Sequence, residues 1–320
     1  MKMDSTMLAE RRRRIGSSDV AAVLGKNRFK APIDVWRRIV LGEEDPIDED
    51  GPAHWGNVLE PVIRAEFLRR QVEAGTAPEF LIEPGRTFFG RHEWEVAHLD
   101  AELPGDPRGI GEIKTDADYP KDEGYRWGRP ETDEVPEDYL IQVQWQLMVA
   151  AESDPTFGYA RVLLLQRGCL FCEYVIHPHL ELQGILREQM SRFWRDHVLT
   201  QHPPTPRDSE EARRLFHESA QTSVILSADA MTALDDLRVL KERAEALELE
   251  IERRKYAIQL ELRESESGLD PKTQRIAVRW KTQEQRRLDT ALVKAQHPQL
   301  YLQCGKLSKS RPFTVAKEFT

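Results

Sequence analysis

A proline-rich run, His202-Pro203-Pro204-Thr205-Pro206, divides the 320-residue chain into two regions with different patterns. A run of prolines cannot continue a helix or a central strand, so a folded region must end there. Before the run, helical and strand-like patterns alternate. After it, one long helical pattern dominates. We therefore predict a core domain over residues 10–206 and a C-terminal appendage over residues 207–320.

The N-terminal region alternates between the two periodicities of regular structure. Apolar residues at helical spacing predict helices at 18–24, 32–40, 54–70, 139–151 and 179–198. Alternating apolar residues between turn signals predict strands at 87–90, 93–100, 109–115, 158–165 and 170–176. Ser17 or Ser18 is the expected N-cap of the first helix, and Gly25 its expected end. These patterns predict an α/β (α+β) core with helices flanking a central mixed β-sheet.

The C-terminal region contains a seven-residue apolar repeat. Its members are Leu237, Ala244, Ile251 and Ile258, with Leu240 and Leu247 three positions after the first two. This spacing predicts a long, coiled-coil-like helix over about 227–266, followed by a strand near 276–280 and a helix near 288–295. With about three heptads, packing on the chain's own domain and pairing with another chain are equal alternatives.

Composition narrows the class of protein. A hydrophobic fraction of 40% and a charged fraction of 32% are typical of a globular domain with a real core. No apolar run is long enough for a membrane span, and we expect a cytoplasmic protein. Cys169 and Cys172 form a CxxC, but no second pair completes a zinc site, and their neighbours favour a strand.

The net charge of −9 argues against a general affinity for nucleic acid. The charges are unevenly distributed, however. Acidic residues cluster at 43–50 and 131–138, whereas 11–14, 69–70 and 275–287 are rich in arginine and lysine. A local basic groove is therefore compatible with an acidic protein.

One predicted strand, 109–115, carries side chains with catalytic potential. Because side chains alternate across a strand, Ile110, Glu112 and Lys114 share one face and Ile113 points to the other. Alone, the Glu112–Lys114 pair could be an ordinary surface ion pair. Asp100 ends the preceding strand, and pairing of the two strands would bring it close to Glu112.

Oxygen donors of this kind favour a hard divalent cation. Asp100, Glu112 and the main-chain carbonyl of Ile113 provide the ligand type that Mg²⁺ or Mn²⁺ selects. A bound metal would polarise a phosphate and generate hydroxide, while Lys114 orients the nucleophile and offsets developing charge. The sequence therefore indicates phosphodiester hydrolysis.

The order Asp100…Glu112-Ile113-Lys114 resembles the D(x)nExK signature of the PD-(D/E)xK nuclease superfamily. Three further segments, IGSSDVAAVLG at 15–25, HWGNVLEP at 54–61 and YLIQVQWQL at 139–147, make the resemblance more specific. Together they resemble the YqaJ-type viral recombinase (lambda-exonuclease-like) family over roughly residues 10–200. The tail from Trp280 to Phe313 also resembles that of some phage-type endonucleases of this family.

The resemblance implies a restriction-endonuclease-like fold and a set of roles. Asp100 and Glu112 would be direct metal ligands, the helix carboxylate of Glu60 would approach the metals, and Lys114 would be the catalytic lysine. Gln142 would lie beside them. The implied cofactor is Mg²⁺, with Mn²⁺ as a substitute and two ions per site.

The resemblance also implies contacts to DNA. Ser18 and Arg11 fall where this family grips a phosphate, and a serine at a helix start near an arginine can form an anion site. The alternative is that Ser18 caps a helix and Arg11 is solvated. A channel lined by basic residues would hold the DNA, and its candidates are Arg11, Arg64, Lys121, Arg126 and Arg129.

One departure from the family pattern concerns His98 and Leu99, which precede Asp100 where a proline or serine is usual. A zinc site made by His54, His92 and His98 is a weaker alternative, because no HxxxH or CxxC spacing organises them.

Three functions remain as hypotheses. The first is a phage or prophage exonuclease that resects duplex DNA ends, with a single-strand annealing protein as partner. The resemblance also implies ring-shaped homo-oligomers as one alternative, with a C-terminal segment that blocks or alters this assembly as the other. The second is an endonuclease or structure-specific nuclease with the same site. The third is a non-catalytic DNA-binding or scaffold protein, which a broken metal set would favour.

Overall fold

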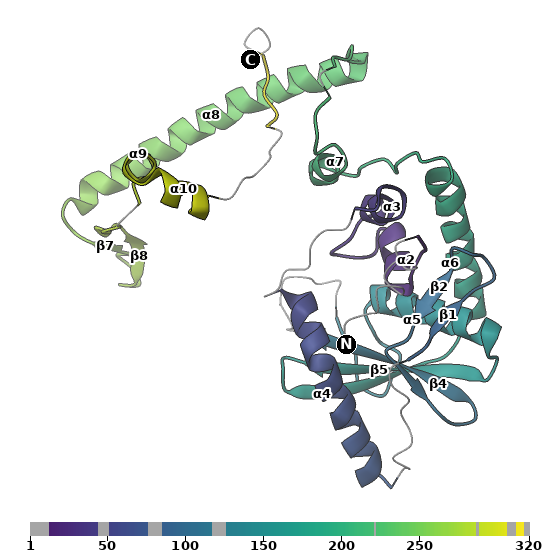
Figure 1. The fold of residues 1–320 in the computed structure, drawn as a ribbon. Helices are drawn as coiled ribbons and strands as arrows, with labels where there is room; N and C mark the ends of the chain where they lie inside the picture. Colours follow the sequence, from purple (N-terminus) through teal and green to yellow (C-terminus); the bar gives the residue numbers. More distant parts are fainter. Residues whose placement is uncertain are drawn as a thin grey trace. The chain divides into compact units, whose positions relative to one another are not determined.

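The computed structural model describes residues 13–43, 51–75, 85–116, 126–220, 222–285, 288–305 and 312–316. The chain divides into two compact units, unit 1 (Met1–Leu215) and unit 2 (Phe216–Thr320), shown in Figure 1. Within the described ranges, every helix is either too short or too polar to span a bilayer.

A four-stranded mixed sheet lies at the centre of unit 1. Its spatial order is β3 (Ala101–Leu103), β4 (Arg108–Asp116), β5 (Phe157–Gln166) and β6 (Leu170–Ile176). β4 and β5 run parallel, whereas β3 and β6 are antiparallel to their neighbours. A parallel pair needs a crossover connection, and α5 (Glu137–Ser153) provides it. This confirms the predicted α/β architecture with a mixed sheet.

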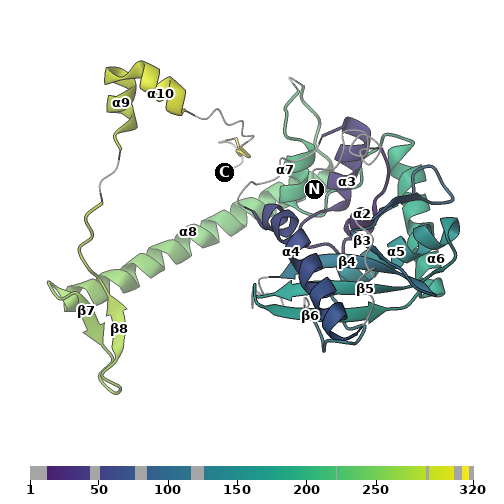
Figure 2. The ribbon, with the colours of Figure 1, turned by 60° about the horizontal axis from the view of Figure 1, so that its bottom comes forward.

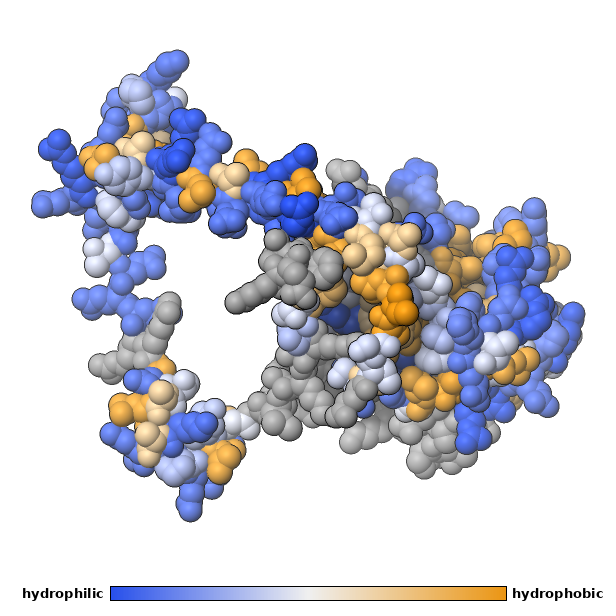
Figure 3. All heavy atoms as spheres, turned by 90° about the horizontal axis from the view of Figure 1, so that it is seen from above, coloured by the Kyte–Doolittle hydropathy of each residue, from blue (hydrophilic) through white to orange (hydrophobic). Residues whose placement is uncertain are grey.

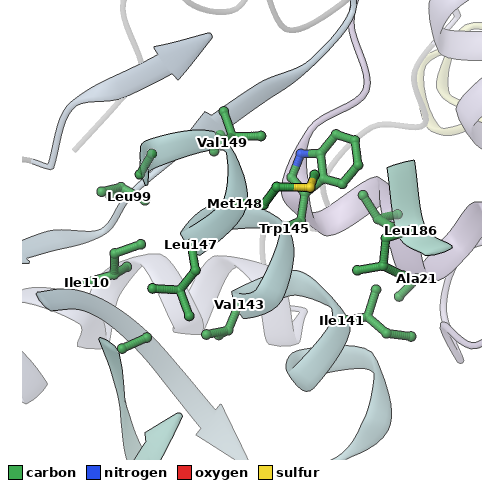
Figure 4. Close-up of a cluster of buried hydrophobic side chains, with 14 of the residues drawn as sticks. Ala21, Leu99, Ile110, Ile141, Val143, Trp145, Leu147, Met148, Val149 and Leu186 are labelled. Carbon is green, nitrogen blue, oxygen red and sulfur yellow. The ribbon is translucent and has the colours of Figure 1, made fainter. Parts of the chain in front are cut away.

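Helices cover both faces of this sheet, and the alternation along β4 explains why. Ile110 belongs to the large core cluster that contains Val143 and Leu147 of α5, and Figure 4 shows these side chains converging. Ile113 instead packs with residues of α4 (Pro52–Glu73), such as Ile63. Figure 2 shows α4 in front of the sheet, with α5 and α6 (Leu180–Phe193) behind it. The predicted opposition of Ile110 and Ile113 is thus confirmed.

α5 is the central helix of unit 1 and is apolar on more than one side. Ile141 and Trp145 belong to the cluster that also holds Ala21 of α2 (Ser17–Val23) and Leu186 of α6 (Figure 4). The indole Nε1 of Trp145 donates to the carbonyl of Val96 at 3.1 Å. A helix that is apolar around most of its circumference must be buried, and α5 is consequently held in place from both sides.

The start of α2 differs from the sequence prediction. Gly16 is the N-cap, and the carboxylate of Asp19 accepts the N–H of Gly16 at 2.8 Å. The prediction of Ser17 or Ser18 as N-cap is therefore wrong, because Asp19 satisfies the free backbone donor and Ser17 is buried in the first turn. Gly25 has a φ of +70° just beyond the helix, which confirms its predicted terminating role.

The strand predicted at 93–100 is shorter and is followed by another strand. β2 (Val96–His98) pairs with β1 (Thr87–Phe89) in a separate two-stranded sheet. β3 begins immediately after Asp100 and pairs with β4, with Ala101 opposite Gly111. Asp100 therefore lies at the junction between two sheets rather than at the end of a single long strand.

Two helices of unit 1 continue as π-helical turns. α3 (Pro32–Trp36) runs into the π-helix Arg37–Leu41, and α6 into Trp194–Val198. α7 (Ser209–Leu215) also belongs to unit 1, because Arg214 donates to Asp34 of α3 at 2.8 Å. Residues 207–215, which the proline run separates from the core in sequence, therefore pack with it.

Unit 2 is built around α8 (Ala228–Leu262), the long helix predicted from the heptad repeat. Its N-cap, Ser227, accepts the N–H of Ala230 at 3.2 Å. The antiparallel pair β7 (Ser267–Leu269) and β8 (Ile276–Arg279) follows, then α9 (Thr290–Gln296) and α10 (Pro298–Cys304). The sequence predicts the region of β8 and α9, but not β7 or α10.

Candidate active site

Backbone pairing positions Asp100 against β4. Its Oδ2 accepts the backbone N–H of Ile113 at 2.8 Å, so the carboxylate is held beside the residue that follows Glu112. The register of β3 with β4 brings these groups together, because Ala101 lies opposite Gly111. The structure thus has Asp100, at the junction before β3, beside the part of β4 that carries Glu112.

Glu112 is buried and receives three side-chain hydrogen bonds. Lys114 Nζ and Gln142 Nε2 donate to Oε1, and Gln146 Nε2 donates to Oε2 at 2.6 Å. Only 1% of the Glu112 side chain is exposed, which means that these donors replace its hydration. Hydrogen bonds to an ionised carboxylate are among the stronger ones in proteins, so the orientation of Glu112 is fixed by α5 and Lys114.

Lys114 is held between a carboxylate and an aromatic ring. Its Nζ donates to Glu112 and lies 5.0 Å from the ring centroid of Tyr139. Burial alone would lower the pKa of Lys114, but the charges of Glu112 and Asp100 outweigh it and raise the pKa above its ordinary value. Lys114 is therefore a cation at neutral pH, suited to stabilising negative charge rather than to accepting a proton.

Asp100 experiences the opposite balance. Burial raises its pKa, the negative charge of Glu112 raises it further, and the net result is a pKa of about 8. Lys114 and the N–H of Ile113 favour the charged form but do not compensate, and Glu60 adds to the repulsion. The negative charges of two neighbouring carboxylates repel each other. A divalent cation bound between them would offset this repulsion.

Glu60 lies on α4 and is tied to Arg64. The Nη2 of Arg64 donates to the carboxylate of Glu60 and, at 3.2 Å, to the carbonyl of Asp100. Arg64 therefore connects α4 to the junction between β2 and β3, although the sequence suggests it for a DNA channel. In the part of the chain that the structure describes, no three or more His, Cys, Asp or Glu side chains gather in a way that could hold a metal ion.

The described residues among the predicted DNA contacts lie on other segments of unit 1. Ser18 is half-buried in the first turn of α2, which packs against α5. Arg126 and Arg129 are exposed in the segment before α5. Between them, Trp127 donates through Nε1 to Asp116 at 2.9 Å, which ties this segment to the end of β4. Arg11 and Lys121 lie outside the described residues.

Within the described ranges, the histidines and cysteines are not gathered into a group that could hold a metal ion. His98 Nδ1 lies 3.0 Å from the hydroxyl of Thr87, an ordinary contact between β1 and β2. Cys169 is free and exposed, and Cys172 is free and buried within β6. The strand interpretation of the CxxC is confirmed.

Two residues of the site are not singled out by sequence reasoning. Gln146 bonds Glu112 and also donates to the carbonyl of His98 at 3.1 Å, and Tyr139 faces Lys114. A usable signal exists for Gln146, since it lies four residues after Gln142 and therefore on the same helix face. No comparable signal exists for Tyr139, because its spacing is also that of an ordinary core position.

Comparison with known proteins shows what this arrangement is similar to. Residues 7–153 match the family model of the YqaJ-like viral recombinase domain. Over these residues the chain is similar to that domain. The matched segment contains every site residue described above, from Ser18 to Gln146.

Relatives of the whole chain and of its fold were also found. The protein YqaJ of Bacillus subtilis (strain 168), described as uncharacterised, is 27% identical over 316 residues, which is 96% of this chain and 92% of that protein. The alignment therefore extends beyond the segment matched by the family model and into unit 2.

Solved structures that align with the chain include two exonucleases. The alkaline exonuclease LHK-Exo from Laribacter hongkongensis is 18% identical, covers 62% of this chain and 94% of its own, and has a TM-score of 0.47. A phage-related exonuclease from Haemophilus somnus 129PT is 15% identical, covers 59% and 96% respectively, and has a TM-score of 0.42.

Proposed function

We propose that this protein is a metal-dependent nuclease that hydrolyses phosphodiester bonds of DNA. The observation that carries the proposal is the cluster of Asp100, Glu112 and Lys114, in which two carboxyl groups, that of Glu112 buried, meet one cation beside the β3–β4 pair. The YqaJ-like domain match supports the same chemistry. An ordinary surface ion pair would not be buried or have the amide donors of α5 around it.

The donor set fits a hard divalent cation such as Mg²⁺ or Mn²⁺. Asp100 and Glu112 would hold it together with the carbonyl of Ile113, and its charge would relieve the repulsion that raises the pKa of Asp100. When bound, such an ion polarises the scissile phosphate and makes a water molecule more acidic. Glu60 would be a ligand of a second ion only after its carboxylate is released from Arg64, with which it is paired in this structure.

The chain's own residues have complementary roles in this proposal. Lys114, protonated at neutral pH, stabilises negative charge on the phosphate and orients the attacking water. Gln142 and Gln146 fix the carboxylate of Glu112. Arg64 fixes the junction at Asp100 through its hydrogen bond to the Asp100 carbonyl. These contacts preorganise the site before substrate arrives.

The finer proposal is an exonuclease that resects duplex ends for phage-type recombination. The names of the aligned exonucleases suggest this activity, and the viral recombinase domain suggests its context, with a single-strand annealing protein as partner. The phosphate grip by Ser18 and Arg11, and the contacts of Arg126 and Arg129 with DNA, belong to this proposal. An endonuclease with the same site is the second candidate, and a non-catalytic scaffold the third.

Digestion of two DNA forms separates these candidates. Linear duplex with 5′-phosphates and closed circular duplex are incubated with Mg²⁺, with Mn²⁺ and with chelator. Degradation of linear DNA alone, dependent on metal, supports the exonuclease. Nicking of the circular DNA favours the endonuclease. Intact DNA in every condition favours the non-catalytic scaffold.

A further inference from the structure

The long helix of unit 2 has an apolar face that its own unit does not cover. In the described part of α8, Leu262 alone has a buried side chain. Leu240, Leu247 and Ile251 are 58%, 60% and 51% exposed. Most helical stability in proteins comes from packing an apolar face, so a 35-residue helix in this state lacks its main source of stability.

The exposed residues form a coiled-coil seam. The a positions are Leu237, Ala244, Ile251 and Ile258, and the d positions Leu240 and Leu247. From Leu237 to Ile258 the seam extends for about 33 Å along the helix. Hydrophobic residues are interspersed with hydrophilic ones on the face of unit 2 seen in Figure 3. Arg254 and Glu261 occupy the next two d positions and weaken the seam toward the C-terminal end of α8.

Charges beside the seam select the partner. In a parallel two-stranded coiled coil, a g residue contacts the e residue five positions later on the other helix. Within the seam, three of these g–e pairs have a charged residue at both positions. Each of the three combines opposite charges: Asp236 with Lys241, Arg243 with Glu248, and Glu250 with Lys255. Two identical copies of this helix therefore place opposite charges against each other when they pair in parallel.

We infer that α8 pairs with α8 of a second copy of this chain as a parallel, two-stranded coiled coil. The existing ion pairs of these charged residues are exposed pairs within one helix, such as Arg254 with Glu250 and Lys255 with Glu252. Pairs of this kind contribute little and exchange readily. They therefore do not compete seriously with pairing between helices.

A second segment of unit 2 contacts α8 and leaves much of the seam accessible. Val315 lines a hollow together with Leu234, Leu237, Arg238, Lys241, Glu242 and Glu245. These are a, e, b and f positions of the first half of the helix, so the segment with Val315 covers the seam at Leu237 and the flank beside it. The d residues Leu240 and Leu247 and the a residues Ile251 and Ile258 are not part of that lining.

Parallel pairing has a consequence for the proposed nuclease. Both copies of Ala228 lie at the same end of the coiled coil, and each is connected through residues 216–227 to its own unit 1. One assembly would therefore carry two active sites joined at the same end. The pairing is measured independently of catalysis, so its failure and that of the proposed function are distinguishable.

The first test is the mass of the full-length chain in solution, measured by sedimentation equilibrium over a wide concentration range. We expect a dimer for the wild type and a monomer for the Leu240→Glu/Leu247→Glu variant, with the dissociation constant raised at least ~100-fold. Leu249→Glu is the matched control, because Leu249 is 59% exposed but occupies an f position. It should remain dimeric, and circular dichroism checks that all variants are helical.

The second test establishes direction. Leu240→Cys is made in a Cys169→Ser/Cys304→Ser background, which removes the exposed cysteines. In a parallel pair the two d residues are opposite each other, so oxidation should give a disulfide-linked dimer, whereas Leu249→Cys should not. A monomeric or trimeric wild type, a dimer that survives Leu240→Glu/Leu247→Glu, or no disulfide at residue 240 would each overturn the inference.

Discussion

Gln146 of α5 connects Glu112 of β4 to the backbone of His98, with a hydrogen bond of 2.6 Å to the Glu112 carboxylate and one of 3.1 Å to the His98 carbonyl. A single buried amide therefore joins both strand segments that lead to the candidate active site. Because Glu112 is buried, the loss of this donor would leave part of its charge without a partner.

Replacement of Gln146 tests this positioning role. We expect Gln146→Leu to lower kcat for DNA cleavage by about 10- to 100-fold, with a smaller effect on KM, because the residue acts through Glu112. Gln144→Leu is the control, since Gln144 bonds the His177 carbonyl and the His179 N–H instead. The control should lower thermal stability yet preserve activity per folded molecule. Equal losses of kcat in both variants would contradict the positioning role.

Replacement of Lys114 tests the charge at the site. Lys114→Met keeps the length of the side chain and removes the cation, so we expect cleavage in single-turnover assays to slow by about 10²- to 10³-fold. Lys26→Met removes an exposed lysine that pairs with Glu137, and it should leave the rate unchanged. A rate for Lys114→Met near that of the wild type would remove Lys114 from catalysis.

Binding of a divalent cation can be measured without DNA. Mg²⁺ or Mn²⁺ at about ten times its dissociation constant should stabilise the fold by about 1.4 kcal/mol, seen as an upward shift in Tm. Asp100→Asn/Glu112→Gln should abolish the shift, since the two carboxylates are the proposed ligands. Glu60→Gln shows whether the helix carboxylate contributes. A shift of the same size in the double variant would place the ion elsewhere.

The buried ion pair between Asp19 and Arg38 predicts a stability effect. The two charged groups are 2.7 Å apart, and only 1% and 4% of their side chains are exposed. Arg38→Ala leaves the Asp19 carboxylate buried without this partner, so we expect the free energy of unfolding to fall by about 3–5 kcal/mol. Denaturant unfolding measures it.

The neighbouring arginine provides the comparison for that experiment. Arg37 pairs with Glu43, whose side chain is 38% exposed, at 3.1 Å. Arg37→Ala should cost about 0–1 kcal/mol, because the Glu43 carboxylate that it leaves behind is in contact with water. Similar losses in the free energy of unfolding for both variants would contradict the role of burial in the contribution of the Asp19–Arg38 pair to stability.

Glu173 of β6 gives stability a dependence on pH. Burial raises its pKa, and the pairing with Arg161 at 2.8 Å only partly offsets this. The folded protein therefore retains a proton that the unfolded chain has released, and the contribution of Glu173 to stability falls as pH rises from the unfolded pKa through the folded one. Above the folded pKa this contribution is constant.

Glu173→Gln should remove that contribution, since an amide does not titrate. The free energy of unfolding of Glu173→Gln relative to the wild type should rise between about pH 4 and neutral pH, as measured by denaturant titration at a series of pH values. Glu188→Gln, at a side chain that is 71% exposed, should give a flat difference. A flat difference for Glu173→Gln as well would contradict this account.

Much of the candidate site follows from local periodicity, which the sequence by itself determines. A strand alternates its side chains, so Glu112 and Lys114 necessarily share a face opposite to Ile113. A helix repeats every 3.6 residues, so Gln142 and Gln146 necessarily share a face too. The long helix α8 and its heptad seam follow in the same way.

Only the tertiary structure decided which of these faces meet. The hydrogen bond from Ile113 to Asp100 depends on β3–β4 pairing, and the bond from Arg64 to the Asp100 carbonyl depends on how α4 packs on the sheet. The N-cap of α2 likewise depends on the Asp19 carboxylate, which is also committed to Arg38. Such contacts join residues far apart in the chain, and no periodic pattern encodes their distances, because strand register and helix packing are set by the whole core at once.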